Sequence, residues 1–219
     1  MPENTNLAAL QNVGLVDGVG DLYAALMTTE DTTTSAPAYG EPELIAEVVD
    51  FQLTYNYAEG NKFASNRAIR KIRRLTGIDL STTYPRMLGE TRRKYFGRGV
   101  DANGGELVGD SMSPLCAIGI CETRDDDTCL MRWILKIRLT EGNVSGKTRE
   151  DGTIEYNDPT LEGSATKLSY VYTDGDNKQW GLFEYVADTA EAGCKWTRET
   201  FFAAVRGPWS EAQPAQAGG

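Results

Sequence analysis

Histidine is absent from this chain of 219 residues. It is the commonest general base at neutral pH, so its absence excludes Ser-His-Asp and Cys-His catalysis and histidine-ligated metals. A phosphate-binding loop, a dinucleotide-binding fingerprint and a nucleophile elbow are also absent. Carboxylate, lysine and tyrosine chemistry remains open, which makes an enzyme less expected without excluding one. We therefore predict no catalytic residue and no cofactor.

The chain has four cysteines but no Cys-x-x-Cys pair. A zinc site would need such pairs, or histidines to complete a mixed ligand set. Each cysteine lies in or beside an apolar stretch, where a thiol packs as a small apolar side chain. We therefore expect buried free thiols and no metal. The four are Cys116, Cys121, Cys129 and Cys194.

Long apolar runs are also absent, since no segment approaches the roughly 18 residues of a membrane span. The first residues lack the basic and apolar regions of a signal peptide. We expect the protein to be made and assembled in a cytoplasm, without membrane binding by this chain.

Charge is unevenly distributed along the chain. The net charge is −10, yet residues 62–98 contain 11 of the 22 basic residues and two acidic ones, which leaves the remainder at −19. The overall charge argues against binding nucleic acid through its phosphates. The basic window is either a solvated face or a surface that meets an acidic partner, such as another copy of this chain. The candidates for that inter-subunit surface are Arg67, Arg70, Lys71, Arg73, Arg74, Arg92 and Arg93.

Alternation of apolar and polar residues predicts several strands. In Leu44–Tyr57 one parity is apolar and the other polar, as in a strand with one buried and one wet face. Cys129–Leu139 alternates in the same way. The Asp-Gly step in Asp174–Asn177 predicts a hairpin turn between Leu161–Thr173 and Lys178–Val186. The polar parity of the first strand consists of Asp50, Gln52, Thr54 and Asn56.

Other segments are less regular. Gly20–Thr29 predicts a strand, with a helix as the alternative, and Gly60 and Asn61 predict a turn within Ala58–Asn66. Ala68–Tyr84 is expected to be extended at its end, although its basic half could be helical.

Two short helices are predicted. Pro85–Phe96 has proline in its first turn and is followed by Gly97, and Trp196–Arg206 has Thr197 as a capping residue.

These elements predict a mainly β fold. We expect a two-sheet β-sandwich or partly closed barrel with one or two short flanking helices. A single domain is expected over residues 20–207, with an extended polar loop at 141–159. An N-terminal arm (1–19) and a flexible C-terminal tail (208–219) flank it.

Three features suggest binding chemistry, each with a plainer alternative. Asp125–Asp127 offers oxygen ligands for calcium, but it lacks the alternating ligands and distant glutamate of an EF-hand and fits a solvated turn. Glu162 could belong to a glycosidase pair, but no second carboxylate is indicated by position. The four tryptophans could form a sugar platform, although tryptophan more often anchors a core or an interface.

The order of several segments resembles the phage major tail protein family, whose members form the tube of long non-contractile tails. The resemblance rests on Gly18–Leu26, the Pro85–Gly97 helix, the strand Met131–Leu139 with the polar segment after it, and Asp158–Ala165. The Thr-Leu-Glu-Gly step and the terminal Phe-Phe helix are its most characteristic parts. It covers roughly residues 14–206 as one domain. The basic window 62–98 is more cationic than the family leads one to expect.

The resemblance implies a tail-tube fold and a structural role in the virion. Subunits of this family close into rings, with hexamers expected here, and the rings stack into a hollow tube through which DNA passes transiently. One sheet of each subunit lines the channel, while loops and arms reach adjacent rings. The implied partners are further copies, the tape measure, the terminator and the baseplate, and the implied location is the virion tail, assembled in the host bacterial cytoplasm. Asp50, Gln52, Thr54 and Asn56 are the candidate channel-lining residues. Alternative functions are another tail component of related fold, a carbohydrate-binding β module and a carboxylate-only hydrolase.

Overall fold

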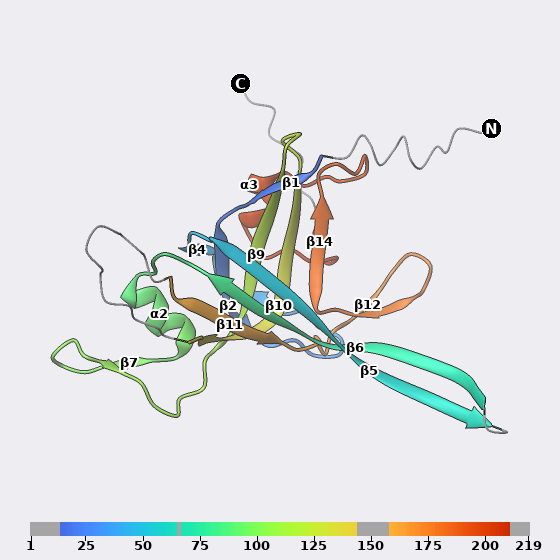
Figure 1. The fold of residues 1–219 in the computed structure, drawn as a ribbon, viewed down its shortest axis with the longest axis horizontal. Helices are drawn as coiled ribbons and strands as arrows, with labels where there is room; N and C mark the ends of the chain where they lie inside the picture. The colour runs from blue at the N-terminus through green and yellow to red at the C-terminus, as the bar shows by residue number, and fades with distance from the viewer. Residues whose placement is uncertain (1–13, 65–66, 144–157, 211–219) are drawn as a thin grey trace, which may run out of the picture.

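One large antiparallel sheet dominates the described part of the chain (Figure 1). The structure is a computed structural model that describes residues 14–64, 67–143 and 158–210, without the side chains of residues 61–70. The predicted mainly β class is confirmed, and the sheet does not close into a barrel over these residues. The strands of this sheet are β1 (Val16–Val19), β2 (Leu22–Thr29), β3 (Ala38–Tyr39), β4 (Glu43–Ala46), β5 (Asp50–Ala64), β6 (Arg67–Thr83), β9 (Leu115–Arg124), β10 (Cys129–Glu141), β11 (Thr160–Ala165) and β14 (Glu184–Asp188).

Two small hairpins and two short helices complete the described fold. One hairpin joins β7 (Gly99–Val100) to β8 (Glu106–Leu107), and the other joins β12 (Val171–Thr173) to β13 (Gln179–Gly181). The helices are α2 (Gly89–Phe96) and α3 (Arg198–Phe202).

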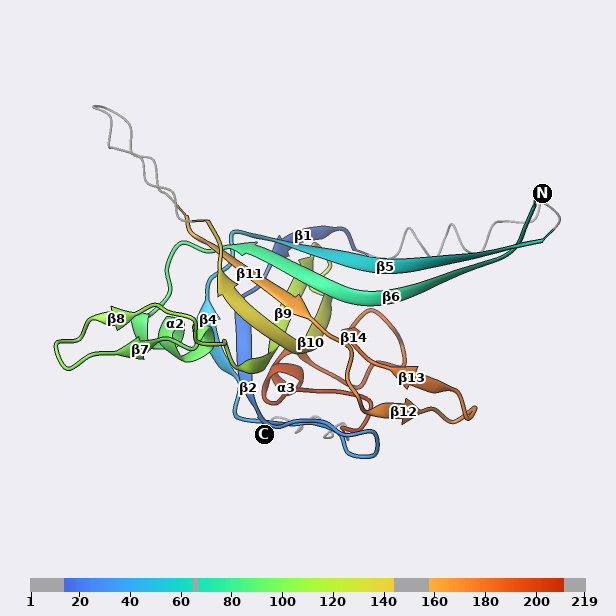
Figure 2. The same ribbon diagram turned by 90° about the horizontal axis from the view of Figure 1, so that it is seen from below.

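The sheet bends into two layers along β10. The first half of β10 pairs with β14 and its second half pairs with β11, and a register shift separates the halves between Ile134 and Ile137. The strands follow the order β3-β2-β9-β10-β11-β6-β5. Beyond the bend, β11, β6 and β5 therefore lie across β2, β9 and β10 as a second layer. Figure 2 shows β5 and β6 above β9 and β10, with α3 on the far side. This arrangement agrees with the expected β-sandwich.

The first core lies between the two layers. Leu80 of β6 and Leu161 of β11 meet Ile118 of β9 and Ile137 of β10 there, all of them buried. Helix α2 adds Tyr95 and covers one end of this core. Burial of side chains of this size contributes about 1.5–3 kcal/mol each.

The helix α2 ends where the sequence predicted. Gly97 adopts a positive φ of 67°, and its N–H donates to the carbonyl of Arg93. A glycine accepts this left-handed conformation without a Cβ penalty, which explains why the helix stops here.

The second core lies between β2, β9, β10 and helix α3. Phe201 of α3 is buried against Trp133 of β10, whose indole N–H donates to the carbonyl of Phe201 at 3.1 Å. Gly119 of β9 makes room for these rings, because a Cβ at this position would lie 2.9 Å from Trp133 and Phe202. Thr197 caps α3, as the sequence predicted, and it forms a capping box with Thr200.

The hairpin of β5 and β6 is longer than the sequence predicted. The turn expected within Ala58–Asn66 was wrong over its described part, because β5 continues to Ala64 and Gly60 lies opposite Ile72 of β6. The basic half of Ala68–Tyr84, for which a helix was an alternative, also belongs to the strand β6. Continuous cross-strand pairing outweighs the local turn preference of Gly60 and Asn61.

Several predicted boundaries also change. The expected strand Leu44–Tyr57 is divided into β4 and β5, because β4 pairs with β2 whereas β5 pairs with β6. Leu161–Thr173 is likewise divided into β11 and β12. The end of the expected N-terminal arm forms β1, which pairs with β9.

The C-terminal side of the domain extends beyond its expected boundary. Trp209, placed in the flexible tail, packs edge-on against Tyr170 in the second core, with ring centroids 5.6 Å apart. Most of the tail (211–219) and of the polar loop (144–157) lies outside the described residues.

Candidate assembly surfaces

The polar parity of β5 lies on the outer face of the sheet. Asp50, Gln52, Thr54 and Asn56 are exposed, while Phe51 and the other residues of opposite parity pack toward the first core. The neighbouring strands extend this outer surface, which we call the polar face. Its other members are Asp79, Ser81 and Thr83 of β6 and Thr160, Glu162 and Ser164 of β11, as the strand registers require.

Hydrogen bonds connect the strands across the polar face. Asp79 accepts from Asn56 Nδ2 at 2.6 Å and from Ser164 Oγ at 2.8 Å, so one carboxylate joins β5, β6 and β11. Asp50 accepts from the backbone N–H of Thr83 at 3.2 Å. Such bonds fix the polar side chains without cations.

The charge of the polar face is negative. Asp50, Asp79 and Glu162 are its charged members, and β5 and β6 up to the bulge, with β11, contribute no lysine or arginine. A shallow groove of about 360 Å³ crosses it, lined mainly by Gln52, Thr54, Ser81, Thr140 and Glu162. The groove holds Glu162, the carboxylate considered for glycoside hydrolysis. Asp79 also lines it, but it already accepts two hydrogen bonds.

Sequence reasoning missed the β6 and β11 members of the polar face. The alternation of Ile78, Asp79, Leu80 and Ser81 is a signal that could have identified β6 as a half-buried strand. The side-by-side placement of β6 and β11 could not be found in this way, because Thr83 and Thr160 are 77 positions apart along the chain.

A cluster of charged and aromatic residues clamps the root of the β5–β6 hairpin. Arg132 of β10 pairs with Glu122 of β9 and with Glu184 of β14, and it donates to the Tyr55 hydroxyl at 3.2 Å. Tyr55 in turn donates to Glu184 at 2.9 Å. Burial, and then Glu184, raise the pKa of Tyr55 to about 12, so its hydroxyl stays protonated and can donate. Tyr55 therefore ties β5 to the other layer.

The hairpin leaves the body directly after this clamp. A bulge places Thr76 of β6 without a partner between the pairs Asn56–Gly77 and Tyr57–Leu75, and the Thr76 hydroxyl donates to the Asn56 carbonyl at 3.0 Å. Bulges of this kind bend a strand and increase its twist. Both Figure 1 and Figure 2 show the hairpin projecting from the rest of the molecule.

The seven basic residues predicted to form one inter-subunit surface lie in two separate places. Five belong to β6 in the projecting hairpin, whereas Arg92 and Arg93 belong to α2 at the opposite end of the molecule (Figure 1). Lys71, Arg73 and Arg74 of the hairpin are exposed, and the side chains of Arg67 and Arg70 lie outside the described part.

Arg92 takes part in an internal network. It donates to Glu106 of β8, which also pairs with Arg98 at 2.9 Å, and Arg98 pairs with Glu141 of β10. The hydrogen bonds from Arg92 and Arg98 lower the pKa of Glu106 to about 2. This network attaches the β7–β8 hairpin to α2 and β10, so Arg92 is engaged within the subunit.

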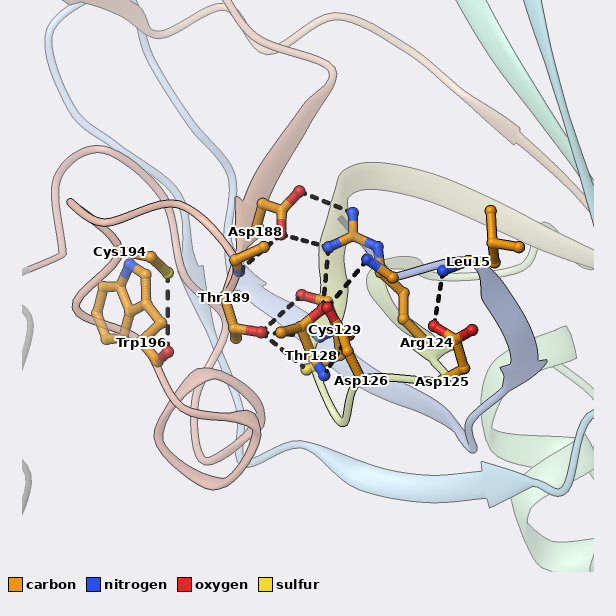
Figure 3. A network of polar contacts seen from close by, with 12 residues as sticks. Leu15, Arg124, Asp125, Asp126, Thr128, Cys129, Asp188, Thr189, Cys194 and Trp196 are labelled. Carbon is orange, nitrogen blue, oxygen red and sulfur yellow. Dashed lines mark hydrogen bonds and ion pairs between the residues drawn. The ribbon is translucent and has the colours of Figure 1, made fainter. Parts of the chain in front are cut away.

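The acidic turn at Asp125–Asp127 holds backbone groups. Asp125 accepts from the N–H of Leu15 at 2.8 Å, and Asp126 accepts from the N–H groups of Gly14 and Thr128, both at 3.0 Å. Figure 3 shows this turn beside the bidentate pair of Arg124 with Asp188. The carboxylates of Asp125 and Asp126 thus secure the entry into β1, in line with the turn interpretation.

The cysteines are mostly interior residues, and so are the tryptophans except Trp180: Trp133 and Trp196 are buried, Trp209 packs against the second core, and Trp180 is 42% exposed. All four thiols are free, and Cys116, Cys121 and Cys129 are buried while Cys194 is half-buried. Burial raises the pKa of Cys116 to about 12. Among the described residues, no three cysteine or carboxylate side chains gather as a metal site would require.

Neither described helix has the length and apolar character needed to cross a membrane.

Comparison with known proteins yields little. No protein-family model and no curated protein sequence matches this chain. Among solved structures, one described as "Structure of a type six secretion system protein" is similar over 78% of this chain and 96% of that chain, with 9% sequence identity and a TM-score of 0.28. A TM-score this low supports no conclusion about function.

Proposed function

We propose that this chain is the subunit of a self-assembling tube, of the kind formed by phage major tail proteins. Copies join into rings, for which six subunits are expected, and the rings stack around a channel. The polar face of β5, β6 and β11 lines that channel. The chain acts by assembly and not by catalysis, and it needs no cofactor. The observation that carries the proposal is this broad, acidic, cation-free sheet face, backed by a core.

The free edge of the sheet supports ring formation. Among the described residues β5 pairs only with β6, so its other edge presents unpaired backbone groups along fifteen residues. Natural proteins usually protect such an edge with lysine, proline or a covering element. Neither residue occurs between Asp50 and Asn61, and the last part of β5 contains one lysine, Lys62. Pairing with a strand of a second copy would satisfy these groups and continue the sheet around a ring.

The charge of the polar face supports passage of DNA. A lysine or arginine facing the channel would add a phosphate contact and slow the moving strand. Carboxylates and uncharged polar groups repel or tolerate phosphate, so DNA would slide past them. In this proposal the chain resides in a virion tail, with the tape measure, terminator and baseplate proteins as its other partners.

Assembly tests the proposal directly. We expect a monomer at low concentration and rings or tubes as concentration rises, visible by negative-stain microscopy. Charged contacts at interface rims are screened over about 8 Å at physiological salt, so the transition should shift with ionic strength in sedimentation. A monomer at all concentrations, even with a tail initiator complex present, would contradict the proposal, and rings that never stack would favour a terminator.

A second experiment tests the channel assignment. Gln52→Lys with Thr54→Lys should preserve folding, because both side chains are exposed and surface substitutions usually change stability by less than about 0.5 kcal/mol. Virions containing this variant should eject DNA more slowly than wild-type virions, and the difference should be larger at low salt than at high salt. The matched control is Thr173→Lys with Gln179→Lys, an exposed cross-strand pair on the β12–β13 hairpin. Ejection at the wild-type rate at every ionic strength would show that the polar face does not line the channel.

A further inference from the structure

We propose that one face of the projecting hairpin docks on an acidic surface of a second copy of this chain. This face, called the bare face below, consists of Ala58 and Gly60 of β5 and Ile72 and Arg74 of β6, which are paired across the strands. The proposal rests on the proposed function, because it assigns a contact within that assembly.

The described side chains of the hairpin beyond the bulge form no core of their own. Every described residue from Tyr57 to Gly60, and from Lys71 to Arg74, is exposed. An isolated two-stranded hairpin is only marginally stable in water, and a longer lifetime requires packing against something else. Since Tyr55 clamps its root, the hairpin is held away from the body it belongs to. Its surface is therefore free to meet another molecule.

The two faces of the hairpin differ in how their charges are satisfied. On the face opposite the bare face, Glu59 lies 3.4 Å from Lys71 and 3.6 Å from Arg73. The Arg73 guanidinium also stacks 4.0 Å above the ring of Tyr57. This second face, the paired face, already uses its charged groups within the hairpin.

The bare face makes no such contacts among the described side chains. Ile72 is 42% exposed, Arg74 forms no ion pair there, and a Cβ added at Gly60 would meet nothing within 4 Å. Gly60 lies opposite Ile72 and Ala58 opposite Arg74, so the β5 side of this face is flat and allows a partner backbone to approach closely. Arginine is enriched among the anchoring residues of protein interfaces, and the neighbouring Ile72 adds apolar surface that a partner can cover.

Charge favours a second copy as the partner. Residues 57–74 contain six basic residues and one acidic residue, a net charge of +5 that leaves −15 on the rest of the chain. The projecting hairpin of one copy and the rest of another copy are therefore electrostatically complementary. DNA is the less favoured partner, because the acidic rest of the same chain would approach the phosphates together with the hairpin and be repelled by them.

The experiment places bulk on the bare face without disturbing the free subunit. Gly60→Trp should leave the melting temperature of the monomer unchanged or higher, since the site is open and aromatic residues favour strands. It should raise the concentration needed for self-association about tenfold or more. The control Glu59→Gln lies on the paired face and removes the one negative charge of residues 57–74. The concentration that this variant needs for self-association should equal that of the wild type or be lower.

The outcomes separate this inference from the proposed function. Tubes that form equally well with Gly60→Trp would overturn the inference and leave the proposed function intact. The wild type could instead form oligomers that are not tubes. If Gly60→Trp abolishes these oligomers and Glu59→Gln retains them, the inference is supported and the proposed tube is contradicted. A wild-type protein that never self-associates would overturn both. Binding of a short DNA duplex through Arg74, lost in Arg74→Glu without any change in self-association, would assign the bare face to DNA instead.

Discussion

Replacing Asp31 by asparagine should lower the free energy of unfolding at pH 7 by about 3 kcal/mol. The Asp31 side chain, in the loop between β2 and β3, is fully buried. It lies 2.7 Å from the ammonium group of Lys136 on β10 and accepts from the backbone N–H groups of Ser169 and Tyr170. One carboxylate thus joins three segments that are distant in sequence. The neutral amide of the variant would leave the ammonium group of Lys136 buried without full compensation.

The effect of Asp31 should depend on pH in a defined direction. Burial by itself would raise the pKa of this carboxyl group, but hydrogen bonds from Lys136, Tyr170 and Ser169 outweigh it and lower the pKa. A group with a lowered folded pKa stabilises the fold above its unfolded pKa, which is about 3.9 for aspartate. That contribution is lost as the pH falls through the folded value. The difference between wild type and Asp31→Asn should therefore be full near pH 7 and shrink below about pH 4.

The neighbouring residue Glu30 provides a matched control. Glu30 also faces Lys136, at 3.6 Å, but its side chain is 68% exposed. Exposed ion pairs contribute about 0–1 kcal/mol, so Glu30→Gln should have a small effect. Urea denaturation of both variants between pH 3 and pH 7 measures the difference. Equal losses from the two substitutions would show that burial of Asp31 does not determine its contribution.

Replacing Phe201 by alanine should cost about 3–5 kcal/mol of folding stability. Phe201 is fully buried and lies at the centre of an aromatic cluster, with ring centroids 5.2 Å from Phe202, 6.1 Å from Trp196 and 6.2 Å from Tyr185. Its removal leaves a cavity that these rigid rings cannot fill by relaxing. The near-ultraviolet circular dichroism of the tryptophans should weaken in the variant.

The substitution Thr197→Ala separates packing from helix formation. Thr197 caps the same five-residue helix, but its side chain is exposed and its loss should cost about 1 kcal/mol. A helix this short contributes little stability by itself, so its role is to deliver Phe201 and Phe202 to the core. If Phe201→Ala costs no more than Thr197→Ala in urea denaturation, the aromatic cluster is not what stabilises this layer.

Local patterns in the sequence predicted much of the sheet. Alternation that only Ile134 interrupts identified β10, and the Asp-Gly step identified the turn between β12 and β13. Capping residues at Gly97 and Thr197 identified one end of each helix. These signals succeed because they act within a few residues along the chain, where backbone preferences and the two-residue period of a strand determine the outcome.

Non-local contacts limited the prediction of the hairpin and the basic surface. Gly60 and Asn61 have turn preferences, yet pairing with β6 keeps both of them in a strand. Arg92 and Arg73 belong to one basic window in the sequence, but Glu106 engages the first within the subunit and the second lies on the far hairpin. Charge counted along the chain does not show which charges share a surface.

The sequence by itself determined the mainly β class, the absence of histidine chemistry and the polar parity of β5. Each of these follows from composition or from a period of two, which needs no knowledge of distant residues. The tertiary structure decided that Asp79, Ser81 and Glu162 extend this parity into one acidic face, and that Asp31 is buried against Lys136. It also decided that the hairpin projects beyond Tyr55 with one face bare. The physical reason is that strand register and ion-pair partners arise from contacts between residues far apart in the chain, which no local pattern encodes.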